Sequence, residues 1–136
     1  MTQKEIFRKK CIENSKKLVQ KTNFYKMQRK AIFHLDRLLQ GILKDTPRQK
    51  MNILCYASME NELNTSTIIN KYRKKHKIYI PFIEEKSFKM VAFRLPIKKQ
   101  KFNVKSANNS GFYDKKIDIM IVPIIGIDKK NRRIGF

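Results

Sequence analysis

Residues 2–44 carry apolar positions at helical spacing, and they predict two helices. The tetrad Thr2-Gln3-Lys4-Glu5 is a capping box, in which the threonine caps the first turn while the glutamate reaches back to its backbone N–H. A second helix is predicted over residues 23–44, and Pro47 marks its end. We expect its core-facing stripe to consist of apolar residues spaced three or four apart: Met27, Ala31, Leu35, Leu38 and Ile42.

Beyond residue 50 the pattern changes to short apolar runs rich in β-branched residues. They predict strands over residues 51–58, 77–83 and 88–95, with a basic amphipathic helix over residues 65–75 between the first two. A strand, a helix and a strand within roughly 30 residues form a βαβ unit. Its two strands are expected to run parallel. Residues 96–116 are polar and are interpreted as a long connection.

The apolar run at residues 117–127 predicts a last strand. Its β-branched composition is typical of a strand that is buried on both faces, as in a parallel sheet with helices on either side. Pro123 cannot donate a ladder hydrogen bond, so we expect regular pairing to end there. A polar turn follows, and the sequence stops at Phe136, soon after this strand. We therefore expect a further segment to follow.

Length and charge limit the possible classes of protein. A chain of 136 residues fits one domain that buries about two thirds of its unfolded surface. The net charge of +21 suggests either a polyanion partner or a lysine-rich, solvated surface. The second interpretation is favoured, because 24 of the 32 basic residues are lysines spread along the chain, whereas nucleic-acid readers favour clustered arginine.

Membrane, redox and metal functions find little support in the sequence. No apolar run reaches the ~18 residues that a membrane span requires, so no membrane partner is expected. Cys11 and Cys55 lie far apart without metal-ligand or redox spacing, which predicts reduced thiols in a cytoplasmic protein. His34 and His76 are also isolated, and neither suggests a catalytic pair or a zinc site.

Lys4 and Arg8 lie on the side of the first helix that is predicted to face the protein. At about 100° per residue they project beside the apolar residues Phe7 and Cys11, whereas Lys9-Lys10 points well away. Two cations four residues apart repel by ~0.2–0.5 kcal/mol, and an anion held between them would relieve that repulsion. The alternative is that both side chains are solvated or snorkel along apolar surface.

A loop at residues 57–62 follows the first predicted strand. Ligands of open α/β sheets bind beyond the carboxyl ends of the strands, so this loop is a candidate binding segment. Glu62 lies shortly before the predicted 65–75 helix. On residue type alone its carboxylate is best explained as an acid that favours the positive end of that helix, by ~0.3–1 kcal/mol.

Three separated segments carry the most specific patterns: Lys4-x-x-x-Arg8, YASMENELNT at residues 56–65, and VPIIGIDKKNRRIG at residues 122–135. In this order they resemble motifs of the 5-formyltetrahydrofolate cyclo-ligase (methenyltetrahydrofolate synthetase) family. The resemblance covers nearly the whole chain, which ends before the family's glycine-rich loop. Residues 102–107 depart from the family, which commonly has a glycine, a hydrophobic residue and Glu-Pro there.

The resemblance implies a three-layer α/β/α fold with a mainly parallel, Rossmann-like sheet. It implies a single α/β domain over residues 1–136 that lacks its C-terminal part. The implied activity is the ATP- and magnesium-dependent cyclisation of 5-formyltetrahydrofolate to 5,10-methenyltetrahydrofolate, with release of ADP and phosphate. In this chemistry the formyl oxygen takes the γ-phosphoryl group, N10 attacks the activated carbon, and phosphate leaves.

The resemblance also assigns residues to the two substrates. ATP phosphates would be bound by Lys4, Arg8, Arg133, Ile134, Gly135 and Phe136. Ala57 and Met59 would line the folate pocket, and Glu62 would orient the pterin ring, because a carboxylate can accept two parallel N–H bonds. No residue is assigned as catalytic, and the magnesium ligand is expected beyond Phe136.

Two alternatives to an active enzyme stay open at this point. The chain is either a basic α/β module that binds RNA or another polyanion, or an inactive fragment of the enzyme. We favour a monomer that binds folate and ATP, without a nucleic-acid partner.

Overall fold

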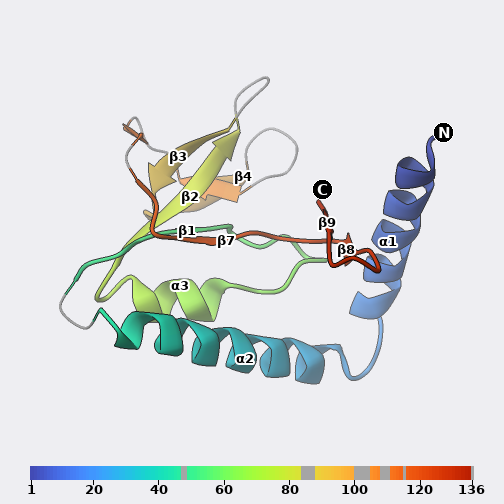
Figure 1. Ribbon diagram of the computed structural model, residues 1–136, viewed down its shortest axis with the longest axis horizontal. Coiled ribbons are helices and arrows are strands. Elements are labelled where there is room, and N and C mark those ends of the chain that lie inside the picture. Colours follow the sequence, from blue (N-terminus) through green and yellow to red (C-terminus); the bar gives the residue numbers. More distant parts are fainter. Residues whose placement is uncertain (47–48, 84–87, 100–104, 108–110, 115, 136) are drawn as a thin grey trace.

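A computed structural model describes residues 1–46, 49–83, 88–99, 105–107, 111–114 and 116–135 of the chain (Figure 1). The helices are α1 (Gln3–Val19), α2 (Phe24–Lys44) and α3 (Ser66–Tyr72). The strands are β1 (Asn52–Cys55), β2 (Lys77–Ile83), β3 (Phe88–Ala92), β4 (Ile97–Lys99), β5 (Lys105–Ala107), β6 (Phe112–Tyr113), β7 (Ile119–Ile121), β8 (Gly126–Ile127) and β9 (Arg133–Ile134).

The capping box at the start of α1 is confirmed. The backbone N–H of Glu5 donates to Thr2 Oγ1 at 3.3 Å, and the backbone N–H of Thr2 donates to Glu5 Oε2 at 2.7 Å. These bonds satisfy two of the amide groups that a helix start leaves without an intrahelical partner. The same bonds, the backbone one first, lower the pKa of the Glu5 carboxyl.

The main sheet is mixed, with strand order β6-β3-β2-β1-β7. β1 runs parallel to β2 and to β7, which confirms the predicted βαβ unit. β3 is antiparallel to both β2 and β6. β2 ends at Ile83 and β3 begins at Phe88, and a connection this short cannot hold the crossover of a dozen or more residues that parallel strands need. Half of the sheet is therefore antiparallel.

The helices α2 and α3 cover one face of the sheet (Figure 1). Leu39 of α2 and Ile68 of α3 form a buried cluster with Ile53 of β1 and with other residues of β1 and β2. Ile80 lies on the same face of β2 as Ile78, which belongs to this cluster, but Ile80 packs against Ala107 of β5. Among the described residues no helix lies on the opposite face, so α/β is confirmed but the three-layer, Rossmann-like arrangement is not.

The last predicted strand is shorter and less buried than expected. β7 covers only Ile119–Ile121, and in the described residues it is an edge strand that pairs with β1 alone. Met120 is 54% exposed, because it points away from the face that the helices cover. The prediction of a strand buried on both faces was therefore wrong. Pairing does end before Pro123, as predicted.

Residues 96–116 are also more regular than predicted. They contain the antiparallel pair β4–β5, and they contain β6 at the edge of the main sheet. The polar composition hid these strands, because β4 and β5 are only three residues long and β6 only two.

The helix α2 has the predicted bounds to within one residue, but it buries a different stripe. Leu39 is 2% exposed, and Ile32, Leu35 and Leu43 pack around the same cluster. Leu38 is 62% exposed and Ile42 is 44% exposed, although both were expected to face the core. Of the predicted stripe, only Leu35 packs against the core cluster; Met27 and Ala31 are exposed as well. Two apolar stripes at helical spacing lie side by side on α2, and only packing chooses between them.

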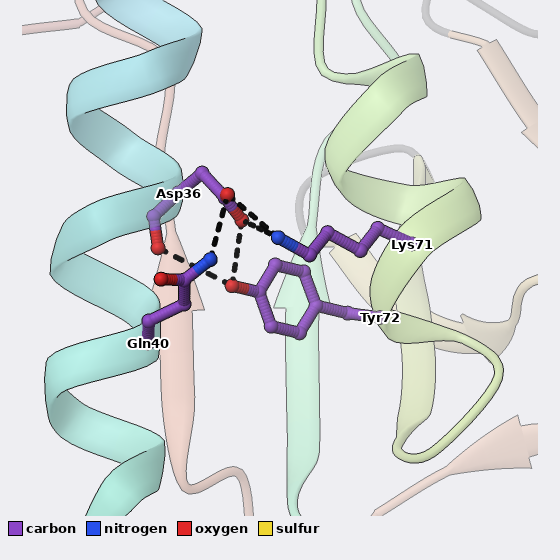
Figure 2. A network of polar contacts seen from close by, with 4 residues as sticks. All are labelled: Asp36, Gln40, Lys71 and Tyr72. Atoms are coloured by element: carbon purple, nitrogen blue, oxygen red, sulfur yellow. Dashed lines mark hydrogen bonds and ion pairs between the residues drawn. The ribbon is translucent and has the colours of Figure 1, made fainter.

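A polar network joins α2 to α3 (Figure 2). The Lys71 ammonium lies 2.6 Å from Asp36 Oδ2, and the Tyr72 hydroxyl donates to Asp36 Oδ1 at 2.8 Å. Gln40 donates its amide to the same carboxylate at 3.0 Å. Burial acts to raise the pKa of the Asp36 carboxyl, but the hydrogen bonds from Lys71 and Tyr72 and the Lys71 charge together hold that pKa below its usual value.

Candidate functional site

The loop of residues 56–65 is fixed by hydrogen bonds within itself. It begins directly after β1, at the carboxyl end of the parallel strands. The Thr65 hydroxyl is fully buried and donates to the Tyr56 carbonyl at 2.7 Å, and the Tyr56 hydroxyl donates to the Leu63 carbonyl at 3.0 Å. These two bonds join the ends of the loop, so its shape is set before any ligand binds.

Glu62 is the buried acid of this loop, with 9% of its surface exposed. Its carboxylate Oε2 accepts the backbone N–H of Met59 at 2.8 Å, and its own N–H donates to the Met59 carbonyl at 3.2 Å. The carboxylate therefore closes the Met59–Glu62 turn. Burial, and then the negative charge of Glu62, raise the pKa of the neighbouring Tyr56 hydroxyl. Ala57 and Met59 are half-buried on the same loop.

Two polar residues that sequence reasoning missed connect this loop to helices. Gln28 of α2 donates its amide N–H to the Glu62 carbonyl at 3.0 Å, and its amide oxygen accepts the Asn64 N–H at 2.8 Å. The Ser15 hydroxyl of α1 donates to the Asn61 carbonyl at 2.9 Å. The sequence offers no signal for Gln28, because this residue lies outside the apolar stripe of α2 that was expected to face the core.

The helix α1 also contacts the hairpin β8–β9 (Figure 1). A Cβ placed on Gly126 would lie 2.7 Å from Cys11 Sγ and 3.7 Å from Phe7 Cε1, so the glycine lets the helix approach the β8 backbone. This packing confirms that the Phe7 and Cys11 side of α1 faces the protein. By helical geometry Lys4, Arg8 and Ser15 lie on or beside that side.

The two arginines of the β8–β9 hairpin differ in their contacts. Arg132 Nε lies 2.6 Å from Asp128 Oδ2, and the backbone N–H of Arg132 donates to Asp128 Oδ1. These bonds, the backbone one first, lower the pKa of the Asp128 carboxyl. Asn131 has a φ of 57°, which asparagine tolerates in a tight turn. Arg133 makes no ion pair within the described part of the chain.

The predicted phosphate-binding residues lie on two adjoining elements. Lys4 and Arg8 are exposed on α1, as are Lys9-Lys10, so exposure alone does not separate the two pairs. Arg133 and Ile134 form β9, and Ile134 pairs with the Gly126 that α1 contacts. The Arg133 guanidinium lies close to Gly135, 2.7 Å from the position of a Cβ there. Phe136 lies outside the described residues.

These elements match a known family along the whole chain. The model of the 5-formyltetrahydrofolate cyclo-ligase family matches residues 1–136. The chain belongs to the 5-formyltetrahydrofolate cyclo-ligase family. The NMR structure of Aquifex aeolicus 5,10-methenyltetrahydrofolate synthetase is similar to it, with a TM-score of 0.70 and 16% sequence identity. That match covers 99% of this chain and 68% of the Aquifex chain, and it supports a common fold. A search of curated proteins found no match.

The described residues of this cyclo-ligase family chain give no support for thiol chemistry at Cys55 or for a metal site. Burial raises the pKa of the Cys55 thiol to about 12, so the thiol is protonated and unreactive at neutral pH. The described residues hold no group of three or more His, Cys, Asp or Glu side chains that could bind a metal ion. They also form no helix long and apolar enough to cross a membrane.

Proposed function

We propose that this chain carries folate-binding and phosphate-binding parts of an ATP-dependent 5-formyltetrahydrofolate cyclo-ligase. The reaction would convert 5-formyltetrahydrofolate to 5,10-methenyltetrahydrofolate in the cytoplasm, with a monomer as the acting unit. The observation that carries the proposal is the fixed loop of residues 56–65. It holds a buried carboxylate at the carboxyl end of β1, where ligands of open α/β sheets bind, in a chain that matches the family from end to end.

In this proposal Glu62 orients the pterin. A carboxylate accepts two parallel N–H bonds from an amino-pyrimidinone edge, and in a buried setting such charge-assisted bonds are strong. The Met59 N–H already holds one carboxylate oxygen in place. A ligand that binds there would meet a group that is already oriented, with Ala57 and Met59 beside it.

The phosphates of ATP would bind between α1 and the β8–β9 hairpin. Lys4 and Arg8 supply positive charge from the helix, and Arg133 supplies it from β9, whose neighbour β8 contacts the same helix. The segment Arg133–Gly135 would place its backbone beside the phosphates. Ser15 links α1 to the Glu62 loop, so one helix joins the phosphate side of the site to the folate side.

Positioning and charge neutralisation would supply most of the catalysis. The formyl oxygen takes the γ-phosphoryl group and ADP leaves, N10 then attacks the activated formyl carbon, and phosphate departs. Holding the two substrates together removes much of the entropic barrier. The three basic side chains neutralise charge that moves onto the transferred group. Magnesium would neutralise further phosphate charge when bound, and we assign none of its ligands.

The experiment compares two pairs of variants by calorimetric titration with each substrate. Glu62→Gln is expected to weaken 5-formyltetrahydrofolate binding by about 1.5–3 kcal/mol while ATP binding changes little, because glutamine loses the charge but keeps an acceptor for the Met59 N–H. Glu60→Gln is the matched control, since Glu60 is an exposed acid of the same loop. Equal losses for both substrates would show that Glu62 acts only on the fold.

The second pair tests the phosphate side. Lys4→Ala with Arg8→Ala is expected to weaken ATP binding at least tenfold, whereas Lys9→Ala with Lys10→Ala removes the same charge from the same exposed helix and should change it less than threefold. Equal losses in the two double variants would indicate a general charge effect and would refute the assignment. Unchanged ATP binding in both would refute it as well.

A further inference from the structure

A basic hollow lies at the opposite end of the parallel strands from the candidate site. It has a volume of about 540 Å³, and the residues that line it include Arg73, Lys74, His76, Lys77 and Phe93. Lys77 begins β2 and pairs with Asn52, the first residue of β1. The loop that holds Glu62 follows the last residue of β1, so the hollow and the candidate site are separate features of the molecule.

The positive charge of the hollow is concentrated, and its cations form no ion pair within the described part of the chain. Residues 71–77 read KYRKKHK, and no acidic residue occurs from Leu63 to Ile83. Lys71 is paired with Asp36, but Arg73, Lys74 and Lys77 make no ion pair with any described residue. All three are exposed. Three unpaired cations around one hollow create a local field that attracts a polyanion.

The hollow also brings an arginine and an aromatic ring together. The Arg73 guanidinium lies 5.4 Å from the centroid of the Phe93 ring, although the two residues are far apart in the sequence. A guanidinium plane held over an aromatic ring is a platform on which a nucleobase can stack.

His76 adds a neutral polar group to the same hollow. Its Nδ1 accepts the backbone N–H of Met51 at 3.2 Å, which requires an unprotonated Nδ1. Burial, and then the charge of Lys75, lower the pKa of the imidazole, which favours the neutral ring that this hydrogen bond requires. Nε2 then carries the proton and can donate a hydrogen bond.

We propose that this hollow binds single-stranded nucleic acid. Arg73, Lys74 and Lys77 would contact backbone phosphates, and a base would stack on the Arg73–Phe93 pair. A single strand fits better than a duplex, because only unstacked bases expose a face for stacking. This activity goes beyond the proposed cyclo-ligase function and does not depend on it, because the two sites share no residue.

The test measures the anisotropy of a fluorescein-labelled 12-nucleotide oligouridine titrated with the whole chain between 50 and 200 mM salt. The triple variant Arg73→Ala, Lys74→Ala, Lys77→Ala is expected to bind at least tenfold more weakly. Its plot of log affinity against log salt should also be shallower by about 2, since each lost phosphate contact removes about 0.7. The matched control Lys9→Ala, Lys10→Ala, Lys16→Ala removes three cations from α1 and should lose less than threefold.

A second variant separates stacking from charge. Phe93→Leu keeps an apolar side chain of similar size and every cation, so it should weaken oligouridine binding about fivefold or more while the salt dependence stays unchanged. Equal losses in the two triple variants would refute a defined site. Competition by tripolyphosphate as effective as by unlabelled oligouridine would also refute it, because it would show that phosphate charge alone is recognised.

Discussion

Helices α1 and α2 are neighbours in the sequence and similar in length, but they are attached to the molecule very differently. No residue of α1 is buried, and its Phe7 is 40% exposed. α2 buries Leu39 to 2% exposure and packs three more apolar residues around the same cluster. Both helices reach the loop of residues 56–65, one through Ser15 and the other through Gln28.

The difference suggests that the two parts of the candidate site are held in place with different firmness. The proposed folate side rests on a loop that is closed by its own hydrogen bonds and held by α2, which the Asp36 network also fastens to α3. The proposed phosphate side rests on α1, whose contacts among the described residues include the Ser15 hydrogen bond and the contact of Phe7 and Cys11 with Gly126, but no fully buried side chain. Elements that move on ligand binding come from the less stable parts of a fold. We therefore expect the folate side to be formed in advance and the phosphate side to be ordered by ATP.

The largest expected effect comes from the core contact of α2. Leu39→Ala should lower the free energy of unfolding by about 2–5 kcal/mol, because it removes a fully buried side chain and leaves a cavity. Phe7→Ala removes a larger side chain from α1, but it should lower that free energy by only about 1–2 kcal/mol, because Phe7 is already 40% exposed. Urea unfolding of both variants measures the two values. A loss from Phe7→Ala as large as that from Leu39→Ala would show that α1 is anchored as firmly as α2.

A smaller effect is expected from the polar link between α2 and α3. Asp36→Asn should lower the free energy of unfolding at pH 7 by about 1–2 kcal/mol, because it loses the charge that binds Lys71 and Tyr72. Solvent screens this ion pair, since the Lys71 side chain is 47% exposed, and the expected loss is correspondingly small. Glu13→Gln is the matched control, because Glu13 is an exposed acid on α1. Equal losses from Asp36→Asn and Glu13→Gln would mean that the contacts of Asp36 add nothing to stability beyond the effect of net charge.

The contribution of this network to the free energy of unfolding depends on pH, and the direction follows from the pKa of Asp36. The pKa of the Asp36 carboxyl is lower in the folded chain than its ordinary value of 3.8, so the unfolded chain binds the proton more readily. The contribution of Asp36 to stability is therefore present above that value and is lost as the pH falls through the lower folded pKa. Urea unfolding between pH 5 and pH 3 should show the difference between wild type and Asp36→Asn becoming smaller. A difference that grows on acidification would contradict this account.

The sequence predicts where the helices and strands lie better than it predicts which side of each one is buried. The capping box, the three helices and β2 follow from spacing and residue type. The choice between the two apolar stripes of α2 does not, because Leu38 and Leu39 are equally apolar and only the position of the sheet decides which is buried. β7 shows the same limit: its composition indicates a buried strand, but its burial depends on what lies beside it.

The candidate site shows a similar pattern. The three segments were recognised from motifs, but the contacts that join them were not, because Ser15 and Gln28 act through backbone carbonyl and amide groups that leave no sequence pattern. Gly126 lies within one of these motifs, and nothing in the sequence marks it as a contact with a helix. Its role becomes clear when Cys11 lies against it, and the two residues are distant in the sequence.

The smallest expected effect on stability, and the most direct test of the comparison, is Gly126→Ala. The new Cβ would lie 2.7 Å from Cys11 Sγ, so α1 must shift, but the weak attachment of this helix should limit the loss of unfolding free energy to about 1 kcal/mol or less. ATP binding should fall several-fold by calorimetric titration, because Lys4 and Arg8 move with the helix, whereas 5-formyltetrahydrofolate binding should change little.

Adding Cys11→Ala to Gly126→Ala removes the sulfur and leaves a contact of 3.6 Å, so the double variant should recover ATP binding. Gly41→Ala, with no atom within 4 Å of the new Cβ, is the control and should leave both affinities unchanged. If the double variant fails to recover, or if folate binding falls as much as ATP binding, then α1 does not serve the phosphate side alone and the two regions are not independent.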